Sequence, residues 1–476
     1  MIASSKPSLL KNWSYLLASD ITQQAVGFLI VIVLARKLAP EGYGQYSVIL
    51  SLVAIVSIFA NFGMNLVLTR EITLNPNHTK RYISLIAPIR TASFLISIVA
   101  FLVYFYIYNG DQTTLIFVTL IVFNLVLWDI CESIAFGHFI TKYSSSLNII
   151  FATLWLLAIV VSPNQLFNVT YVLIIYSSIL FLKAFCYMVL IKRNLLATSK
   201  TDEDSIIGRK KLISMSLPYL WMRGLGVLVD QVPILILSTM SGAKEVGYFS
   251  VGTKLMVPVT MSLSTALRAM FPFMTKLYWE DKILFSRKIQ EGITFVVCLG
   301  TVIALFTSIS SIYWIPFIFG NSYIPSIESF NFLIWFGVIL TIDLLLSASL
   351  SSSYKQNALA ILTTIDVVIA IPLYYLGAMH GALGLSIAKF IFGIIVLTYH
   401  WIAFSMLLKV KIGSKDIIIL GSFFCFAVAI CFIQISFSAK VLLAFLLLGV
   451  YAVRRDSPLR QSYRMVMSFA FSGNKK

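Results

Sequence analysis

Ionisable side chains interrupt many of the long hydrophobic stretches of this sequence, and their chemistry is the first guide to function. A charge in the middle of a membrane-spanning helix costs at least about 2.5–3.5 kcal/mol, so each one needs a partner or a use. The basic residues of this kind are Arg90, Lys183, Arg223, Lys254, Arg268 and Lys389, and the acidic ones are Asp20, Asp129, Glu132, Asp230, Asp343 and Asp366. The six positive and six negative charges balance, so composition alone does not predict a basic cavity.

Asp129 and Glu132 lie three positions apart, which makes them neighbours on one helix face. Such a pair could take up a coupling proton or Na⁺, because a nearby like charge raises one pKa. The alternative, which we favour slightly, is that both carboxylates pair with bases on adjacent helices. Asp230 follows Arg223 by seven residues on the same helix face, so an internal ion pair is equally open there. His400 could titrate, but no partner for it is visible in the sequence.

The elements that carry these residues are transmembrane helices. Of 476 residues, 59% are hydrophobic and only 12% are charged, whereas soluble domains carry roughly 25% charge. Apolar runs of about 20 residues recur along the chain, and each can span a bilayer as a helix. The sequence therefore predicts an all-α polytopic membrane protein of about 14 (12–14) spans. The predicted spans are 13–38, 43–69, 82–108, 113–138, 146–161, 169–191, 213–239, 246–274, 291–315, 328–353, 358–376, 384–407, 416–435 and 439–453.

The distribution of Lys and Arg predicts the orientation. With the N-terminus inside, 26 of the 36 basic residues fall in cytoplasmic segments and four on the other side. Both termini are therefore expected in the cytoplasm, and the net charge of +17 is mostly a topology signal with no need for a nucleic-acid partner. We expect four parts: an N-lobe (1–196), a cytoplasmic linker (197–212), a C-lobe (213–407), and two extra spans with a basic tail (408–476).

Several enzyme and metal signatures are missing from the sequence. It contains no GxxxxGK[ST], HExxH or GxSxG motif, and its five cysteines form no CxxC pair or Cys/His cluster. No connecting loop exceeds about 21 residues, which leaves no soluble catalytic domain. We therefore expect no catalytic residue, no metal site and no enzyme activity.

Two related segments indicate an internal repeat. Residues 34–47 (LARKLAPEGYGQYS) contain Pro40, Gly42 and Gly44 and predict a tight turn between two spans. At an offset of 203 positions, Leu34, Gly44 and Ser47 recur as Leu237, Gly247 and Ser250. These identities fall at matching places in two similar hydropathy patterns, which points to a duplicated six-helix lobe.

Segment 34–47 resembles the polysaccharide-transporter branch of the MOP superfamily, which includes Wzx-type flippases. The pattern there runs roughly LARxLGPEGYGxYS, and Ala39 departs from its glycine. Further matches in order are Phe62-Gly63, Arg70-Glu71-Ile72, Pro272, the segment 319–326 (FGNSYIPS) and the pair Gly381 and Gly384.

The resemblance implies a two-lobed transporter whose central cavity opens alternately to each side. Its cargo would be an undecaprenyl-diphosphate-linked oligosaccharide repeat unit of O-antigen, capsule or exopolysaccharide, carried across the bacterial inner membrane. Partners would be the lipid-linked glycan, membrane lipids, and a polysaccharide polymerase with other assembly proteins. No cofactor is expected beyond a coupling H⁺ or Na⁺. A multidrug antiporter of the same superfamily is the nearest alternative, and a membrane glycosyltransferase, a polymerase or a non-transporting scaffold is a more distant one.

Within this interpretation the diphosphate would meet four basic residues, Arg223, Lys254, Arg268 and Arg90. Arg223 lies about ten residues into its span, or ~15 Å deep, where snorkelling to the surface is hardest. Arginine suits phosphate because its planar fork can donate two parallel hydrogen bonds. Lys183 and Lys389 lie closer to span ends and are expected to snorkel to the interface instead.

Overall fold

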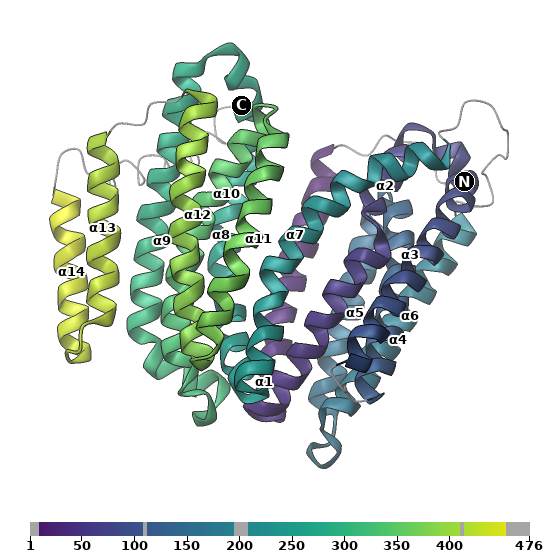
Figure 1. Ribbon diagram of the computed structural model, residues 1–476, viewed down its shortest axis with the longest axis horizontal. Coiled ribbons are helices and arrows are strands. Elements are labelled where there is room, and N and C mark those ends of the chain that lie inside the picture. The colour runs from purple at the N-terminus through teal and green to yellow at the C-terminus, as the bar shows by residue number, and fades with distance from the viewer. Residues whose placement is uncertain (1–8, 108–111, 195–207, 410–413, 454–476) are drawn as a thin grey trace. The chain divides into compact units, whose positions relative to one another are not determined.

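The structure, a computed structural model, describes residues 9–107, 112–194, 208–409 and 414–453 (Figure 1). Within these residues it is built from α-helices joined by short turns, and no strand occurs there. Ten of the helices are long and apolar enough to cross a membrane, and two further apolar helices are shorter. The prediction of an all-α polytopic fold is confirmed, whereas the count of fourteen spans stays a prediction.

Most predicted spans coincide with one helix each. These helices are α3 (Thr79–Ile107), α4 (Gln112–Gly137), α5 (Thr141–Val161), α6 (Val169–Asn194), α7 (Arg209–Ser241), α8 (Ala243–Glu280), α9 (Lys282–Phe319), α10 (Ser326–Ser352), α11 (Gln356–Ala378), α12 (Gly381–Leu408), α13 (Ser414–Phe432) and α14 (Phe437–Val453). The first two spans differ: they belong to α1 (Leu9–Asn61), which continues after a break at Gly63 as the short α2 (Met64–Leu74).

The first turn of the chain lies at Ala39, where α1 changes direction sharply (Figure 1). Ala39 has φ 55° and ψ 176°, a conformation that is almost reserved for glycine. Pro40 starts the second arm of α1, as proline at a first helical position often does. Gly42 and Gly44, which the sequence suggested as turn residues, are helical.

The turn between α7 and α8 repeats this geometry at the offset of 203 residues. Gly242 has φ 86° and ψ 172°, so it has a positive φ and an extended ψ like Ala39. The two turns also pack against each other. A Cβ added to Gly44 would lie 1.7 Å from the carbonyl oxygen of Ala243, and one added to Gly247 would lie 2.0 Å from that of Pro40. Because Pro40 corresponds to Ala243 and Gly44 to Gly247, the contact is reciprocal. We call it the paired-turn contact.

Lys37 joins the first turn to the end of α5. Its Nζ donates hydrogen bonds to the carbonyl oxygens of Ile159 (2.9 Å) and Ser162 (2.8 Å), and it lies 4.8 Å from the ring centre of Phe167. The last carbonyls of a helix lack partners within the helix, and a cation there is also attracted to the negative end of the helix dipole. Lys37 therefore caps α5.

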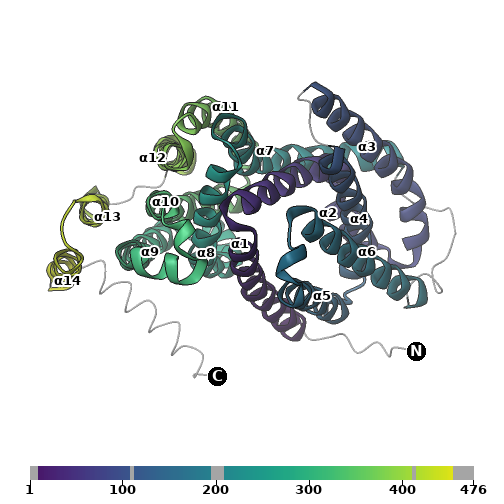
Figure 2. The ribbon, with the colours of Figure 1, turned by 90° about the horizontal axis from the view of Figure 1, so that it is seen from below.

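The chain divides into two compact units, Met1–Gly247 and Tyr248–Lys476. In the first unit α1 packs against α3, α4, α5 and α7, while α6 packs on α4 (Figure 2). Its core includes Leu68, Tyr82 and Tyr187, which are at most 1% exposed. The predicted linker, 197–212, lies mostly outside the described residues, so the four-part division stays a prediction.

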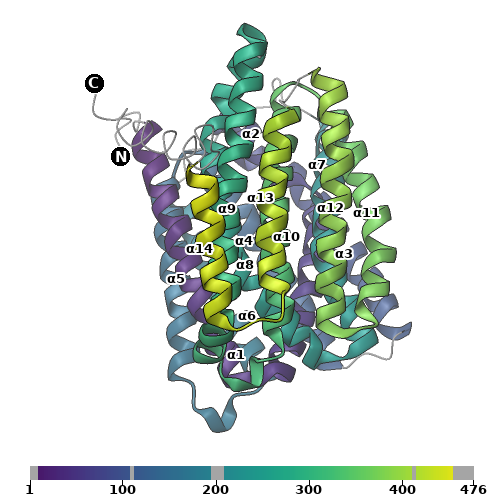
Figure 3. The same cartoon turned by 90° about the vertical axis from the view of Figure 1, so that its left-hand side faces the viewer.

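In the second unit α10 packs between α9 and α12, and α11 packs on α12. Asp281 starts α9 by accepting hydrogen bonds from the backbone N–H groups of Ile283 and Leu284, each at 2.9 Å. Helices α13 and α14 lie side by side against α9 (Figure 3). The core between α9, α10 and α12 includes Phe285, Leu346 and Phe404, all fully buried.

Candidate functional site

A polar network fills the interior of the first unit, and three of the predicted site residues, Arg90, Asp129 and Glu132, belong to it. Its centre is Asp129 on α4, which accepts a hydrogen bond of 2.5 Å from Asn61 Nδ2 at the end of α1. Arg90 on α3 interacts electrostatically with the same carboxylate and donates a hydrogen bond to Asn65 on α2. Arg90 is only 2% exposed, so its guanidinium is surrounded by protein and serves to hold Asp129 and Asn65.

Glu132, one helical turn along α4, anchors a second branch of the network. Its Oε1 accepts a hydrogen bond of 3.0 Å from Asn148 on α5, and Asn148 in turn accepts one of 3.1 Å from the Tyr187 hydroxyl on α6. Lys183, also on α6, interacts electrostatically with Glu132 and lies 3.5 Å from the ring centre of Trp128. We call these two branches, centred on Asp129 and Glu132, the α4 network.

The α4 network matches the alternative in which both carboxylates have bases on neighbouring helices. A carboxylate in this environment needs a cation, because desolvation would otherwise favour its neutral form.

Lys183 and Lys389 were expected to snorkel, and this expectation was wrong: they are 8% and 6% exposed. Lys389 on α12 lies 5.6–5.7 Å from the rings of Phe249, Phe336 and Tyr374. Their ring faces attract the ammonium and replace part of its hydration.

Arg223 on α7 is placed differently from Arg90. Its side chain is exposed, yet it interacts electrostatically with Asp129. It is therefore an accessible cation at the edge of the α4 network. Asp230 on α7 is also exposed, and within the described part of the chain it forms no ion pair with Arg223.

The other two predicted basic residues lie on α8. Lys254, in the second unit, is exposed. Arg268 lies within α8, but its side chain is outside the part of the chain that the structure describes. The expected contact of Lys254 and Arg268 with the diphosphate stays a prediction.

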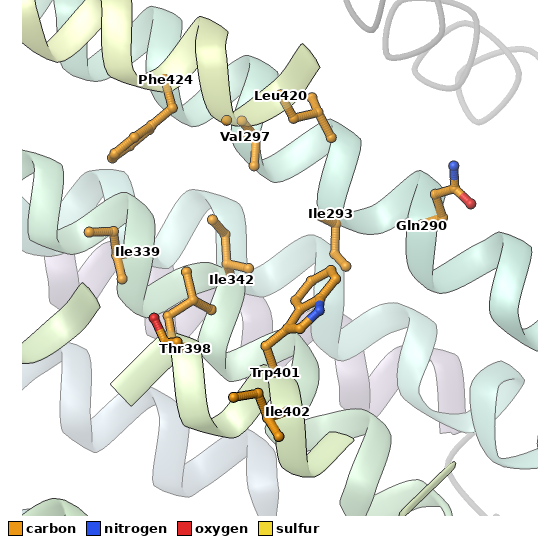
Figure 4. Close-up of a pocket in the computed structure, with 12 residues that line it drawn as sticks. Gln290, Ile293, Val297, Ile339, Ile342, Thr398, Trp401, Ile402, Leu420 and Phe424 are labelled. Atoms are coloured by element: carbon orange, nitrogen blue, oxygen red, sulfur yellow. The ribbon is translucent and has the colours of Figure 1, made fainter. Parts of the chain in front are cut away.

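An apolar pocket lies in the second unit between α9, α10, α12 and α13, with a volume of about 370 Å³ (Figure 4). Ile293 and Val297 of α9, Trp401 of α12, and Leu420 and Phe424 of α13 line it. None of its lining residues is charged, so it suits hydrocarbon and offers no cation to a phosphate. A polar headgroup therefore has better partners at Arg223 than in this cavity.

Comparison with known proteins identifies the family to which the chain belongs. A family model described as "Polysaccharide biosynthesis protein" matches residues 9–278, more than half of the sequence. The chain belongs to this family. A relative is the capsular polysaccharide biosynthesis protein CapF of Staphylococcus aureus, 24% identical over 408 residues that cover 80% of this chain and 97% of CapF.

Solved structures of other proteins have a fold similar to that of this chain. The lipid II flippase MurJ in an inward closed conformation has a TM-score of 0.68 at 13% identity, over 91% of this chain and 97% of MurJ. An inward-facing multidrug resistance MATE transporter of the MOP superfamily has a TM-score of 0.61 at 15% identity, over 82% of this chain and 96% of the transporter. The expected transporter-like fold is thus confirmed by these structures, and the expected polysaccharide family by the family model.

The sequence did not single out the amides of the α4 network. Asn61, Asn65 and Asn148 lie near span ends or among small polar residues, where asparagine is common, so their types alone gave no signal. One clue was available: Asn61 and Asn65 flank the Phe62–Gly63 break, and an amide beside a helix break can project into the interior. Gly63 has φ 64° and approaches the backbone of Leu220 on α7.

Proposed function

We propose that this protein is a flippase that moves an undecaprenyl-diphosphate-linked oligosaccharide repeat unit from the cytoplasmic to the outer leaflet of the bacterial inner membrane. The observation that carries the proposal is the combination of membership in a polysaccharide biosynthesis family with the fold of a lipid II flippase. The relative CapF is named for capsular polysaccharide, which supports a lipid-linked glycan over a drug as cargo.

The transport step needs no covalent chemistry. A glycan headgroup with its diphosphate cannot cross about 30 Å of hydrocarbon unless protein encloses its path. We propose that the helical lobes rock to expose the cargo alternately to each side, with both termini in the cytoplasm. Binding near mid-membrane between repeated lobes is common in secondary transporters.

Arg223 is the residue proposed to contact the diphosphate. It combines an exposed side chain with a position near the middle of α7, and it interacts electrostatically with Asp129. Lys254 and Arg268 are proposed as further contacts from α8. Arg90 is proposed as a positioning residue, because its guanidinium is already bonded to Asn65 and buried.

The test is transport of a short-chain diphosphate-linked oligosaccharide by the purified protein in liposomes, followed by its accessibility to a glycan-oxidising reagent outside. Each lost charged hydrogen bond costs about 1.5–3 kcal/mol, so Arg223→Ala should slow transport at least about tenfold. Arg223→Lys should retain part of the rate. Lys210→Ala, an exposed cation on the first turn of α7, is the matched control and should leave the rate unchanged.

Two outcomes would contradict the proposal. If the wild-type protein leaves the glycolipid in its original leaflet but expels organic cations, the antiporter alternative holds. If Arg223→Ala transports like Lys210→Ala, the cargo does not meet Arg223. In cells, loss of the protein should make the lipid-linked oligosaccharide accumulate on the inner leaflet, and normal surface glycan would argue against the flippase.

A further inference from the structure

Four side chains on α10, α11 and α12 meet in the second unit around a buried imidazole. His400 on α12 is 2% exposed, and its Nδ1 lies 2.6 Å from Asp343 Oδ1 on α10. Its other ring nitrogen, Nε2, lies 3.3 Å from Asp366 Oδ1 on α11. The Tyr399 hydroxyl donates a hydrogen bond to that same Asp366 oxygen. We call these four residues the His400 cluster.

The cluster lies deep within the helices that carry it. Asp343, Asp366 and His400 are each eight to ten residues from the helix end that leads to Lys355 or Lys409, which corresponds to about 12–15 Å at the helical rise. At that depth the carboxylates cannot reach the surface, because an aspartate has too short a stem to snorkel.

The charge of the cluster depends on how many protons it holds. With a neutral imidazole and two ionised aspartates it carries two negative charges in a buried site. One proton on His400 gives it an N–H donor toward each aspartate and leaves a single negative charge. Burying an unpaired charge is costly, so the protonated cluster is the favoured state of this arrangement.

Among the side chains that the structure describes, the neighbouring helices supply no competing charge beside the imidazole. Apart from the cluster, the charged residues on the three helices are Glu328, in the first turn of α10, and Lys389, three turns away along α12. On α9, which packs against α10, Lys288 and Glu291 pair with each other at 2.6 Å. The aspartates are therefore the groups that set the protonation of His400.

We infer that the His400 cluster is a proton-binding site, and that its protonation is coupled to transport. A metal ion is a poorer occupant because the imidazole fills the space between the carboxylates, and the described residues contain no grouping of His, Cys, Asp and Glu suited to hold a metal. The proton holds α10, α11 and α12 together through His400. A change in helix packing that separates Asp343 from His400 removes a stabilising carboxylate and releases the proton. This coupling rests on the proposed function, whereas the proton site itself does not.

The proton site can be tested without any cargo. The chain has four histidines, so a nitrogen NMR spectrum of the full-length protein in lipid nanodiscs, with labelled histidine, can be assigned by His400→Gln. We expect the His400 signal to change from imidazolium to neutral imidazole within pH 5–10. Asp343→Asn should lower the proton affinity of His400 at least about tenfold, because an adjacent negative charge is removed. The midpoint of the His400 titration should therefore fall by at least about one pH unit. His380→Gln, an exposed loop histidine, should leave the His400 titration unchanged.

If the wild-type His400 signal remains that of a neutral imidazole from pH 5 to 10, the proposed proton site is refuted. This readout does not depend on whether the variants fold. The same conclusion follows if a stably folded Asp343→Asn protein titrates like the wild type.

Coupling is tested in liposomes with a difference of one pH unit across the membrane. Each coupled proton can change the accumulation of cargo by up to about tenfold. We expect the wild type and His380→Gln to respond to the gradient and His400→Gln to lose the response. Transport of glycolipid that ignores the gradient would refute the coupling but keep the flippase. Titration of His400 without any glycolipid transport would refute the flippase but keep the proton site.

Discussion

Adding a single methyl group at Gly44 tests the paired-turn contact most directly. The Cβ of an alanine there would lie 1.7 Å from the carbonyl oxygen of Ala243 and 2.7 Å from its carbon. Because real Cβ contacts stay beyond about 3 Å, the first residue of α8 must withdraw by about 1.3 Å, and the obstacle is backbone with no rotamer to change. Overpacking costs typically about 1–3 kcal/mol, and a backbone obstacle belongs at the upper end.

The measurement is thermal unfolding of the purified protein in one detergent, with Gly27→Ala as the matched control on the same helix. Nothing lies within 4 Å of a Cβ at Gly27, so that variant should be slightly more stable, by about 0.5–1 kcal/mol. Gly44→Ala and Gly247→Ala should each lower stability by about 3 kcal/mol. Their effects should not add, because one separation of the turns relieves both overlaps.

Equal stability of Gly44→Ala and Gly27→Ala would refute the close approach. Additive losses in the double variant would show that the two glycines act at independent contacts, which would refute its reciprocal character.

Three further predictions concern stability. Ala39→Gly should raise stability by about 1 kcal/mol, because a left-handed conformation is strained for alanine and free for glycine, and a lower unfolding temperature would contradict the turn geometry. Lys183→Met should lower stability by about 3 kcal/mol by leaving Glu132 unpaired, and adding Glu132→Gln should restore most of it; a double variant no better than the single one would show that the two residues are not coupled. Burial lowers the pKa of His138, which lies beyond the end of α4 beside Thr79. The unfolded chain therefore binds a proton first as pH falls below about 6.5, so stability should drop on acidification, and His138→Gln should flatten that slope between pH 7.5 and 5.5.

The helices were predictable from sequence because long apolar runs leave little alternative in a bilayer. The first turn was placed only approximately, since glycine and proline suggested positions 40–44 while an alanine takes the strained conformation. The sequence showed Ala39 at the glycine of the family pattern, but nothing in its type revealed the positive φ.

The candidate site was predictable in its members but not in its pairings. Arg90, Asp129 and Glu132 stood out because charges in apolar runs are rare. Their partners come from other helices, and so do the partners of His400, which are 57 and 34 positions away in the chain. The buried lysines were misjudged because stem length was considered and the aromatic faces of Trp128 and Phe249 were not.

The paired-turn contact also bears on the origin of the chain. Pro40 meets Gly247 as Ala243 meets Gly44, which is the pattern of a twofold interface between identical subunits. A half-length ancestor with one such turn would have made the same contact twice as a homodimer, with glycine required in both copies. Fusion of two genes leaves each turn free to change alone. The first turn has alanine at position 39 where the second turn has glycine at the equivalent position 242. Such a difference between the two copies is possible only after fusion.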